Sequence, residues 1–368
     1  MPVINVNIPD EGYPVKLGSG VIEQLPKLIN RATTGGRLFI FYDAQFYVLH
    51  RAYLKKNIKM PEHRLFEMVL PPGERAKSLT TAKKLYEVLL SEKINRSDLI
   101  LACGGGVTTD LVGYTAATIL RGIPWGAVPT TLTGMADAAI GGKTGVNHHL
   151  GKNLIGVFWQ PQFVLCEIRF LATLPFRQLV CGLGEIVKYA GLTGGNMLAE
   201  MNAYLARCDF YDFNALTALI AMGIKYKAGL VAMDTRDNDR RRFLNFGHTF
   251  AHAFEKAAGY GRLLHGEAVI LGVAAALETG YLLKPSLRKY FKPYQLLVNQ
   301  MMQLVPSCRI RLTDVLNALA WDKKNVAGKN KYVLLSRPGK PFITEDPGRE
   351  IIKKVLKKIL LQYQSAGG

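Results

Sequence analysis

The sequence is short of acidic residues, of cysteines and of long apolar runs, and each shortage excludes a class of protein. The five cysteines lie far apart and form no CxxC pair, which excludes a disulfide framework and fits a reducing compartment. No apolar run approaches the roughly 20 residues of a membrane-spanning helix. The N-terminal stretch MPVINVNIPDEGYPVKLGSG alternates like a strand and is unlike a signal peptide. We therefore expect a globular protein of the cytoplasm.

The shortage of acidic residues leaves a large positive charge. Lys and Arg number 47 against 28 Asp and Glu, so the net charge is +19. Such an excess favours anionic partners, which include phosphorylated metabolites, nucleotides, nucleic acid and membrane surfaces. Part of it lies in EIIKKVLKKILLQYQ near the C-terminus, which is typical of an amphipathic helix with a solvated basic face. No RRM-like or zinc-finger spacing supports nucleic-acid binding, so we expect neither a nucleic-acid nor a membrane partner.

The pattern of apolar residues predicts two domains. Up to about residue 175, strand-like runs such as RLFIFYD and SDLILACGGG alternate with helical segments such as TTAKKLYEVLLSEKI. This alternation predicts a parallel sheet with helices on its faces. Beyond that point the apolar spacing is helical nearly throughout. We therefore predict an α/β domain over residues 1–175 and an α-helical domain over residues 176–368.

Two segments of the first domain suit an anionic ligand. The stretch CGGGVTTD (103–110) follows a strand and opens a helix, so its backbone N–H groups can approach a phosphate. It lacks the GxGxxG fingerprint, and a plain tight turn explains it equally. Asp43, at the end of an earlier strand, can accept from a ribose hydroxyl or cap a helix. Residues 136–156 read as a loop in which Lys143, Lys152, Asn147 and Asn153 form either an anion cradle or a solvated surface.

The second domain carries a candidate metal site. Glu185 and Lys188 lie three apart in the apolar helix GLGEIVKYAG, where a buried charge needs a partner or a metal. His248 and His265 stand near the ends of two further helical segments. One carboxylate and two imidazoles would leave positions open, as catalytic zinc does. The sequence has no HExxH motif, so core histidines with hydrogen-bond partners and a surface ion pair remain the alternatives.

A polar stripe precedes and includes one of these histidines. Arg241, Asn245, His248 and His252 share a face if one helix runs through them all. The stripe borders an apolar face, which is unusual for a plain protein core.

Taken together, the motifs resemble the 3-dehydroquinate synthase family. They are GGGVTTDLVGYTAATILRGI, VPTTL, DAAIGGKTGVNHHLGKNLIG, LGEIVKY, LNFGHTFAHAFE, LHGEAV and WDKKN, in the family's order over roughly residues 70–325. The resemblance implies that the α/β domain binds NAD and that the helical domain binds a metal and the substrate. The implied reaction converts 3-deoxy-D-arabino-heptulosonate 7-phosphate to 3-dehydroquinate and phosphate. It runs through transient oxidation by NAD, phosphate elimination, re-reduction, ring opening and an intramolecular aldol step, which makes the enzyme a phosphate lyase.

The resemblance also assigns roles to residues of this sequence. The implied ligands of zinc, or of cobalt, are Glu185, His248 and His265. The implied contacts to the substrate's hydroxyls and carboxylate are Asp137, Lys188, Lys227 and Arg241. The implied phosphate contacts are Lys143, Asn153, Asn245, His252 and Lys324. The implied NAD contacts are Asp43, Glu74, Lys77, Gly105, Gly106, Asp110, Thr130, Thr131, Lys143, Lys152 and Thr173. Arg121 matches a phosphate contact that a partner subunit donates, which implies a homodimer.

The sequence departs from the family pattern in places, and other functions are open. Thr108 and Thr109 stand where the family more often has Ile–Gly, Asp237 where Glu is commoner, and Cys181 where a small or amide residue is frequent. Related sugar-phosphate cyclases share the motifs but act on sedoheptulose 7-phosphate or glucose 6-phosphate. Polyol dehydrogenases of similar architecture lack the Lys and Asn phosphate set. A non-enzymatic protein that binds nucleic acid through its charge would show salt-sensitive binding and hold no NAD.

Overall fold

A computed structural model describes residues 2–33, 35–259, 261–325, 331–345 and 347–365, without the side chains of Leu287 and of residues 321–325. The chain divides into two compact units. Unit 1 comprises Met1–Leu174 and Leu216–Arg236, and unit 2 comprises Pro175–Ala215 and Asp237–Gly368. Residues 216–236 were predicted to belong to the second domain. They pack with unit 1, where Lys227 pairs with Asp137.

Unit 1 is built on a seven-stranded sheet of order β1-β2-β9-β6-β5-β3-β4. Its strands are β1 (Val3–Val6), β2 (Tyr13–Gly18), β3 (Leu38–Asp43), β4 (Leu65–Leu70), β5 (Leu99–Gly104), β6 (Trp125–Pro129) and β9 (Val164–Glu167). All neighbours are parallel except β1 and β2. Every residue of β5 and β6 is buried, which explains why these strands are continuous apolar runs. The predicted α/β fold with a parallel sheet is confirmed.

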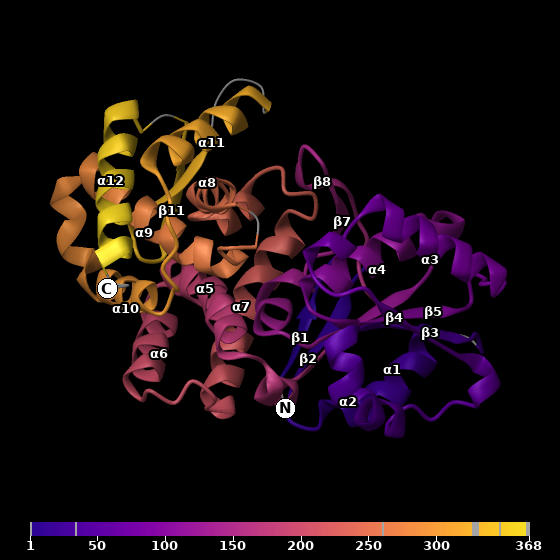
Figure 1. The fold of residues 1–368 in the computed structure, drawn as a ribbon. Helices are drawn as coiled ribbons and strands as arrows, with labels where there is room; N and C mark the ends of the chain where they lie inside the picture. The colour runs from indigo at the N-terminus through magenta and orange to yellow at the C-terminus, as the bar shows by residue number, and fades with distance from the viewer. Residues whose placement is uncertain (1, 34, 260, 326–330, 346, 366–368) are drawn as a thin grey trace. The chain divides into compact units, whose positions relative to one another are not determined.

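The helices of unit 1 cover both faces of this sheet. They are α1 (Leu25–Ala32), α2 (Ala44–Lys56), α3 (Leu79–Ser91) and α4 (Gly106–Thr118). Residues 216–233 of α7 (Phe213–Met233) also belong to unit 1. Figure 1 shows α1 and α2 on one face and α3 and α4 on the other. Right-handed crossovers require this, because the chain moves one way from β3 to β4 and the opposite way from β4 through β5 to β6. The direction reverses between β3 and β5, which makes their carboxyl ends the switch point of the sheet.

The segment predicted to be a loop over residues 136–156 is mostly regular, so that prediction is wrong. A short helical turn, η5 (Gly134–Ala138), leads to a β-hairpin of β7 (Lys143–His148) and β8 (Gly151–Phe158). The ladder is interrupted by an irregularity between Val146 and His148. The crowd of Gly, Lys and Asn concealed the alternation, because these residues are poor strand formers.

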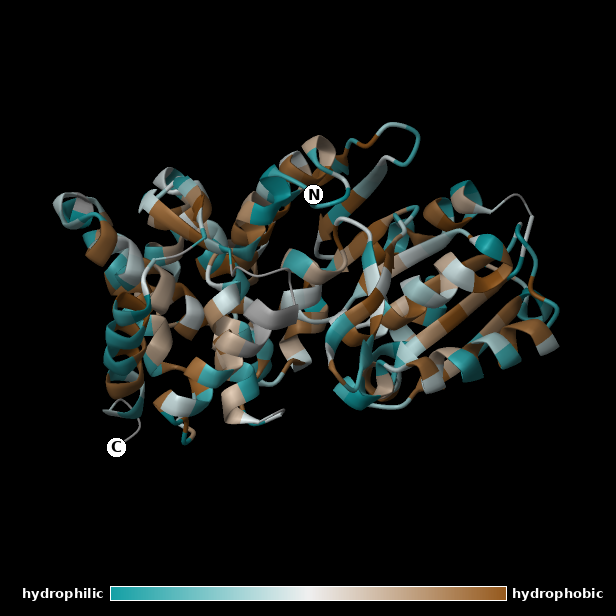
Figure 2. Cartoon of the chain, turned by 90° about the horizontal axis from the view of Figure 1, so that it is seen from above, coloured by the Kyte–Doolittle hydropathy of each residue, from teal (hydrophilic) through white to brown (hydrophobic). Residues whose placement is uncertain are grey.

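Unit 2 is helical, as predicted, with one small sheet that was not predicted. Its helices are α5 (Phe176–Thr193), α6 (Gly195–Ala206), α8 (His248–Ala258), α9 (His265–Leu283), α10 (Lys292–Gln303), α11 (Leu312–Asn325) and α12 (Arg349–Ser365). The strands β10 (Tyr332–Arg337) and β11 (Lys340–Thr344) form an antiparallel pair. The amphipathic α12 packs its apolar side against α9 and leaves Lys353, Lys354 and Lys357 exposed. Figure 2 shows this helix banded in hydrophilic and hydrophobic colours.

Two helices are long and apolar enough to cross a membrane by length and composition, contrary to the sequence-based expectation. They are α7 and α9, and 83% of the apolar window of α9 is buried inside the protein. A helix that is apolar all round and buried in a protein is a core helix, so α9 is the central helix of unit 2.

Candidate metal and nucleotide sites

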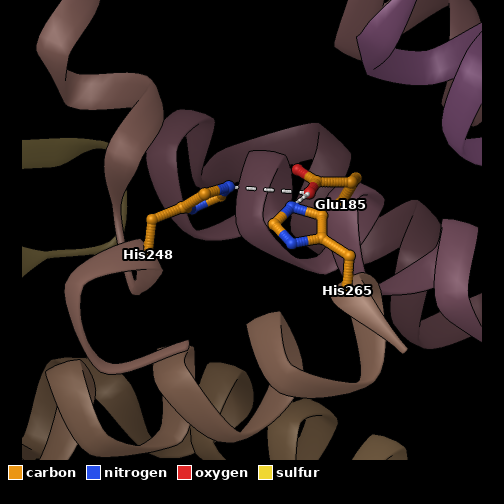
Figure 3. A group of neighbouring side chains, drawn as sticks. All are labelled: Glu185, His248 and His265. Atoms are coloured by element: carbon orange, nitrogen blue, oxygen red, sulfur yellow. Dashed lines mark ion pairs between the residues drawn. The ribbon is translucent and has the colours of Figure 1, made fainter. Parts of the chain in front are cut away.

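Three helices of unit 2 bring the predicted metal ligands together. Glu185 lies in the middle of α5, while His248 and His265 are the first residues of α8 and α9. The Nε2 atoms of His248 and His265 lie 3.6 and 3.3 Å from Oε1 of Glu185. Figure 3 shows both rings directed at this carboxylate. One ligand atom from each of the three residues lies within 4.8 Å of the others, a grouping that can hold a metal ion.

Two glycine contacts set this geometry. A Cβ on Gly266 would lie 1.7 Å from the carbonyl oxygen of Cys181, and a Cβ on Gly184 would lie 2.2 Å from that of Gly266. The backbones of α5 and α9 therefore touch, and they touch at the neighbours of Glu185 and His265. Because only glycine permits this approach, Gly184 and Gly266 are part of the site.

A third glycine contact positions His248. A Cβ on Gly272 would lie 2.2 Å from the carbonyl oxygen of Gly247, the residue that precedes α8. Gly247 also has φ +79°, in the left-handed region that favours glycine. The sequence analysis missed all four glycines, although three of them adjoin a predicted ligand in the sequence.

The electrostatics of Glu185 fit a divalent cation. The side chain is fully buried, and both carboxylate oxygens are shielded from solvent. Nζ of Lys188, itself buried, lies 2.5 Å from Oε2. Burial alone would raise the pKa of Glu185, but the charge of Lys188 and the two histidines hold it well below its usual range. The group thus offers an ionised oxygen and two nitrogens, the donor set of catalytic zinc.

A further carboxylate, which the sequence analysis missed, borders the group. Glu255 of α8 is buried, and its Oε2 lies 3.1 Å from Nδ1 of His265. Burial alone would lower the pKa of His265, but its hydrogen bonds to Glu185 and Glu255 raise it to about 10 in the absence of a metal. Glu255 lies seven residues after His248, on the same helix face, and this spacing was the available signal.

The predicted polar stripe is broken, so one helix does not run from Arg241 to His252. Arg241 and Asn245 belong to the separate turn η7 (Arg240–Asn245), and α8 begins only after Gly247. Arg241 is almost fully buried, whereas Asn245 is exposed. His252 is exposed on α8, with its ring centroid 5.8 Å from that of His248 and 6.1 Å from that of His265.

In unit 1, the predicted nucleotide residues cluster at the switch point of the sheet. Asp43 ends β3, and the glycines Gly104, Gly105 and Gly106 lead from β5 into α4. A Cβ on Gly104 would lie 2.9 Å from that of Asp43, so the two strand ends are in contact. The free backbone N–H groups at the start of α4, a helix of 13 residues, favour an anion there. Oδ1 of Asp43 accepts from Gln45 and Phe46, so the helix-cap interpretation is confirmed.

Lys77 is the centre of a second group in unit 1. Its Nζ bonds to both Asp110 of α4 and Asn153 of β8. Nδ2 of Asn147 donates to Glu74 over 2.7 Å, and the backbone of Asn153 donates to Asn147 over 3.0 Å. Four of the predicted ligand contacts, Glu74, Lys77, Asp110 and Asn153, are therefore joined in one network.

Replacing Lys77 with methionine should destabilise the protein in a pH-dependent way. Burial raises the pKa of Asp110, and Lys77 lowers it again in part. A carboxyl group whose pKa is higher in the folded than in the unfolded protein lowers the free energy of unfolding once the pH exceeds its unfolded pKa, near 3.9 for Asp. Without Lys77 the pKa of Asp110 in the folded protein rises further, so this loss grows. The loss in free energy of unfolding should be small at pH 4 and about 3 kcal/mol at pH 7. Urea unfolding at both pH values measures it, and a loss independent of pH would contradict the Asp110 pairing.

The remaining predicted residues of unit 1 lie at several places. Nζ of Lys227 donates to the carbonyl and Oδ1 of Asp137, both over 2.8 Å. Thr130 and Thr131 follow β6, and the N–H of Thr130 donates to the carbonyl of Gly104, just before α4. Oγ1 of Thr131 accepts a hydrogen bond from the N–H of Gly134. The hairpin carries Lys143 and Lys152, each at the first or second position of its strand.

Three predicted residues stand apart from these groups. Arg121 is exposed in the turn after α4, with φ +63°. Thr173 ends η6 (Ile168–Thr173), and its Oγ1 lies 2.7 Å from Nε2 of His50 on α2. The side chain of Lys324 lies outside those the structure describes.

The structure locates each residue that departs from the family pattern. Thr108 and Thr109 are buried in the first turn of α4, and Thr109 Oγ1 donates to the carbonyl of Gly106. Cys181 packs at the glycine contact, where its sulfur accepts from the N–H of Gly266 over 3.1 Å. Asp237 adopts φ +59° just before η7. None of the three displaces a predicted metal ligand.

Comparison with known proteins gives a consistent result. Residues 67–181 match the family described as 3-dehydroquinate synthase N-terminal, and residues 182–325 match 3-dehydroquinate synthase C-terminal. The 3-dehydroquinate synthase of Nostoc punctiforme is 34% identical over 359 residues, which cover 96% of this chain and 99% of the relative.

Two solved structures share the fold over nearly the whole chain. A 2-deoxy-scyllo-inosose synthase complexed with carbaglucose-6-phosphate, NAD⁺ and Co²⁺ is 25% identical, with a TM-score of 0.85 and coverage of 97% and 100% of the two chains. A 2-epi-5-epi-valiolone synthase from Streptomyces hygroscopicus with NAD⁺ and Zn²⁺ bound is 26% identical, with a TM-score of 0.83 and coverage of 94% and 96%.

Proposed function

This chain belongs to the 3-dehydroquinate synthase family, and on that premise we propose that it converts 3-deoxy-D-arabino-heptulosonate 7-phosphate to 3-dehydroquinate and phosphate. The observation that carries the proposal is the group of Glu185, His248 and His265, with its buried carboxylate. The reaction makes the enzyme a carbon–oxygen lyase that acts on a phosphate. It belongs in the cytoplasm, where the shikimate pathway supplies aromatic amino acids.

We propose NAD and a divalent metal, zinc or cobalt, as cofactors. Glu185, His248 and His265 would hold the metal, which would supply a Lewis acid for the C5 oxygen of the substrate, and NAD would supply reversible hydride transfer at C5. The switch point of the sheet would hold NAD, with the start of α4 suited to the pyrophosphate and Asp43 to the ribose. The other NAD contacts proposed are Glu74, Lys77, Gly105, Gly106, Asp110, Thr130, Thr131, Lys143, Lys152 and Thr173.

We propose substrate contacts within each unit. In unit 1, Asp137 and Lys227 bind hydroxyl groups as a charge pair, and Lys143 and Asn153 bind phosphate. In unit 2, the buried cations Lys188 and Arg241 bind hydroxyl and carboxylate oxygens. Asn245, His252 and Lys324 complete the phosphate contacts. The protein's own contribution is thus orientation and charge stabilisation, because the departing phosphate can itself accept the proton.

We also propose a homodimer in which Arg121 reaches the phosphate bound by the partner subunit. Arg121 is exposed, and its neighbour Leu120 is an exposed apolar residue with φ +48°. Strand β8 of the same unit exposes Leu154, Val157 and Phe158. Exposed apolar side chains on a strand that pairs on one side only favour an interface.

A direct assay tests the proposed reaction. Protein is incubated with Zn²⁺, 3-deoxy-D-arabino-heptulosonate 7-phosphate and NAD at a tenth of the substrate concentration. Complete conversion to dehydroquinate and phosphate, without accumulation of NADH, is expected because NAD is regenerated in each turnover. Parallel incubations contain sedoheptulose 7-phosphate or glucose 6-phosphate, the substrates of related cyclases. Turnover of either, with none of the heptulosonate, would overturn the proposal.

The division of labour between the two α8 histidines gives a further prediction. His252→Ala should keep its zinc, because His252 is exposed and lies outside the group of Glu185, His248 and His265. A second group, His252, Glu255 and His265, could also hold an ion, and this prediction assigns the zinc to the first group. It should raise the KM for the phosphorylated substrate about 10-fold, the loss of one charge-assisted hydrogen bond of about 1.5 kcal/mol. Zinc content by mass spectrometry and steady-state kinetics measure the two effects. A variant that has lost its zinc would show that His252 is itself a ligand.

A further inference from the structure

We infer that Glu255 is a positioning residue for the metal site, which holds Nε2 of His265 toward Glu185 by accepting a hydrogen bond from Nδ1 of the same ring. The inference rests on the metal site of the proposed function. It adds a residue that supports the ligand group without belonging to it.

The first argument is the geometry at His265. Its two ring nitrogens face two carboxylates, with Nδ1 3.1 Å from Oε2 of Glu255 and Nε2 3.3 Å from Oε1 of Glu185. A neutral imidazole carries one proton, so only one nitrogen can donate while the other binds a metal. Glu255 selects the tautomer in which Nδ1 carries the proton. The lone pair of Nε2 then points at the position shared with His248 and Glu185.

The second argument is the burial of Glu255. Only 4% of the residue is exposed, so an ionised carboxylate here must be balanced by a fixed donor. Nδ1 of His265 lies within hydrogen-bond distance of this carboxylate in the structure. A buried, charged acceptor pulls on the Nδ1 proton and makes Nε2 a stronger electron-pair donor to a metal.

The third argument is the contrast with His248. Its Nδ1 lies 3.3 Å from the backbone carbonyl of Phe246, a neutral acceptor in the turn before α8. The two ligand rings are therefore oriented by acceptors of different charge. The charged acceptor serves His265, the more exposed ring, whose side chain is 37% exposed against 13% for His248. Solvent leaves this ring freer to turn, so it gains most from a firm partner.

The test compares metal binding in the unaltered protein and in four variants. Glu255→Gln keeps the size and one acceptor oxygen but removes the charge, and Glu255→Met removes both. Glu278→Gln is the matched control, since Glu278 lies on α9, is largely buried and pairs with Lys358 over 2.8 Å. The fourth variant, Glu185→Gln, removes a ligand. Zn²⁺ affinity is measured by competition with a chromophoric chelator, and folding of each metal-free protein by thermal unfolding.

We expect zinc to bind about 10-fold more weakly to Glu255→Gln and about 100-fold more weakly to Glu255→Met, with no change for Glu278→Gln. The visible spectrum of bound Co²⁺ should keep its shape in Glu255→Gln and change in Glu185→Gln, because only the latter loses a ligand. The isosteric Gln variant should fold, so its affinity remains interpretable if the Met variant does not.

Three outcomes would overturn the inference, and they differ in what else they overturn. If Glu255→Gln binds zinc as the unaltered protein does while Glu185→Gln does not, Glu255 has no positioning role and the metal site stands. If Glu255→Gln loses zinc and Glu185→Gln retains it, the metal lies among His252, Glu255 and His265, and the proposed ligand set fails too. If no protein binds zinc, the metal site itself is wrong.

Discussion

Gly266→Ala is expected to lose its zinc and much of its stability, although it adds a single methyl group. The new Cβ would meet the backbone of Cys181 at 1.7 Å, a contact that no side-chain rotation can relieve. Either α5 and α9 separate, which carries His265 away from Glu185, or unit 2 does not fold. The loss in free energy of unfolding should be larger than about 1–3 kcal/mol, the usual cost of adding atoms to a well-packed core.

Urea unfolding and zinc analysis measure these two effects, and Gly229→Ala provides the control. Gly229 lies in the interior of α7, where an added Cβ meets no atom within 4 Å. That variant should gain about 0.4–1 kcal/mol, because alanine suits a helix better than glycine. An unchanged urea midpoint with full zinc in Gly266→Ala would refute the backbone contact of α5 with α9.

His248→Ala should lose metal and activity together. The substitution removes one of three metal ligands, so zinc should bind more than about 100-fold more weakly. This loss is larger than that expected for a residue that only supports a ligand, such as Glu255. Stability without metal should change little, because His248 is the first residue of α8 and alanine is a good helix former. Thr249→Ala, the next residue, should retain both zinc and activity. Zinc titration and the phosphate-release assay test this pair, and full zinc occupancy in His248→Ala would remove His248 from the ligand set.

The elements with a strong apolar pattern could be predicted from the sequence. RLFIFYD became β3, and TTAKKLYEVLLSEKI became α3. These segments are specified locally, because burial of a whole strand or of one helix face leaves a regular pattern. The metal ligands were also accessible, since each lies within a recognisable motif.

What the sequence did not reveal depends on contacts between distant segments. The stripe from Arg241 to His252 has helical spacing, yet Gly247 must adopt a positive φ to pass Gly272, and this breaks the helix. Glu255 appeared to be one more charged residue of α8 until the fold placed His265 beside it. Residues 216–233 of α7 likewise make contacts that are distant in the sequence, such as that of Lys227 with Asp137, 90 residues away.

The return of α7 to unit 1 has a consequence for the timing of synthesis. A nascent chain that has been synthesised up to Leu174 contains all seven strands of the sheet, but it still lacks the helix that carries Lys227. Residues 175–236 must be made before unit 1 is complete, which takes roughly 3–12 s at about 5–20 residues per second. During that interval the ion pair of Asp137 with Lys227 cannot form. Residues 175–215, the first segment of unit 2, are therefore synthesised before unit 1 can finish folding.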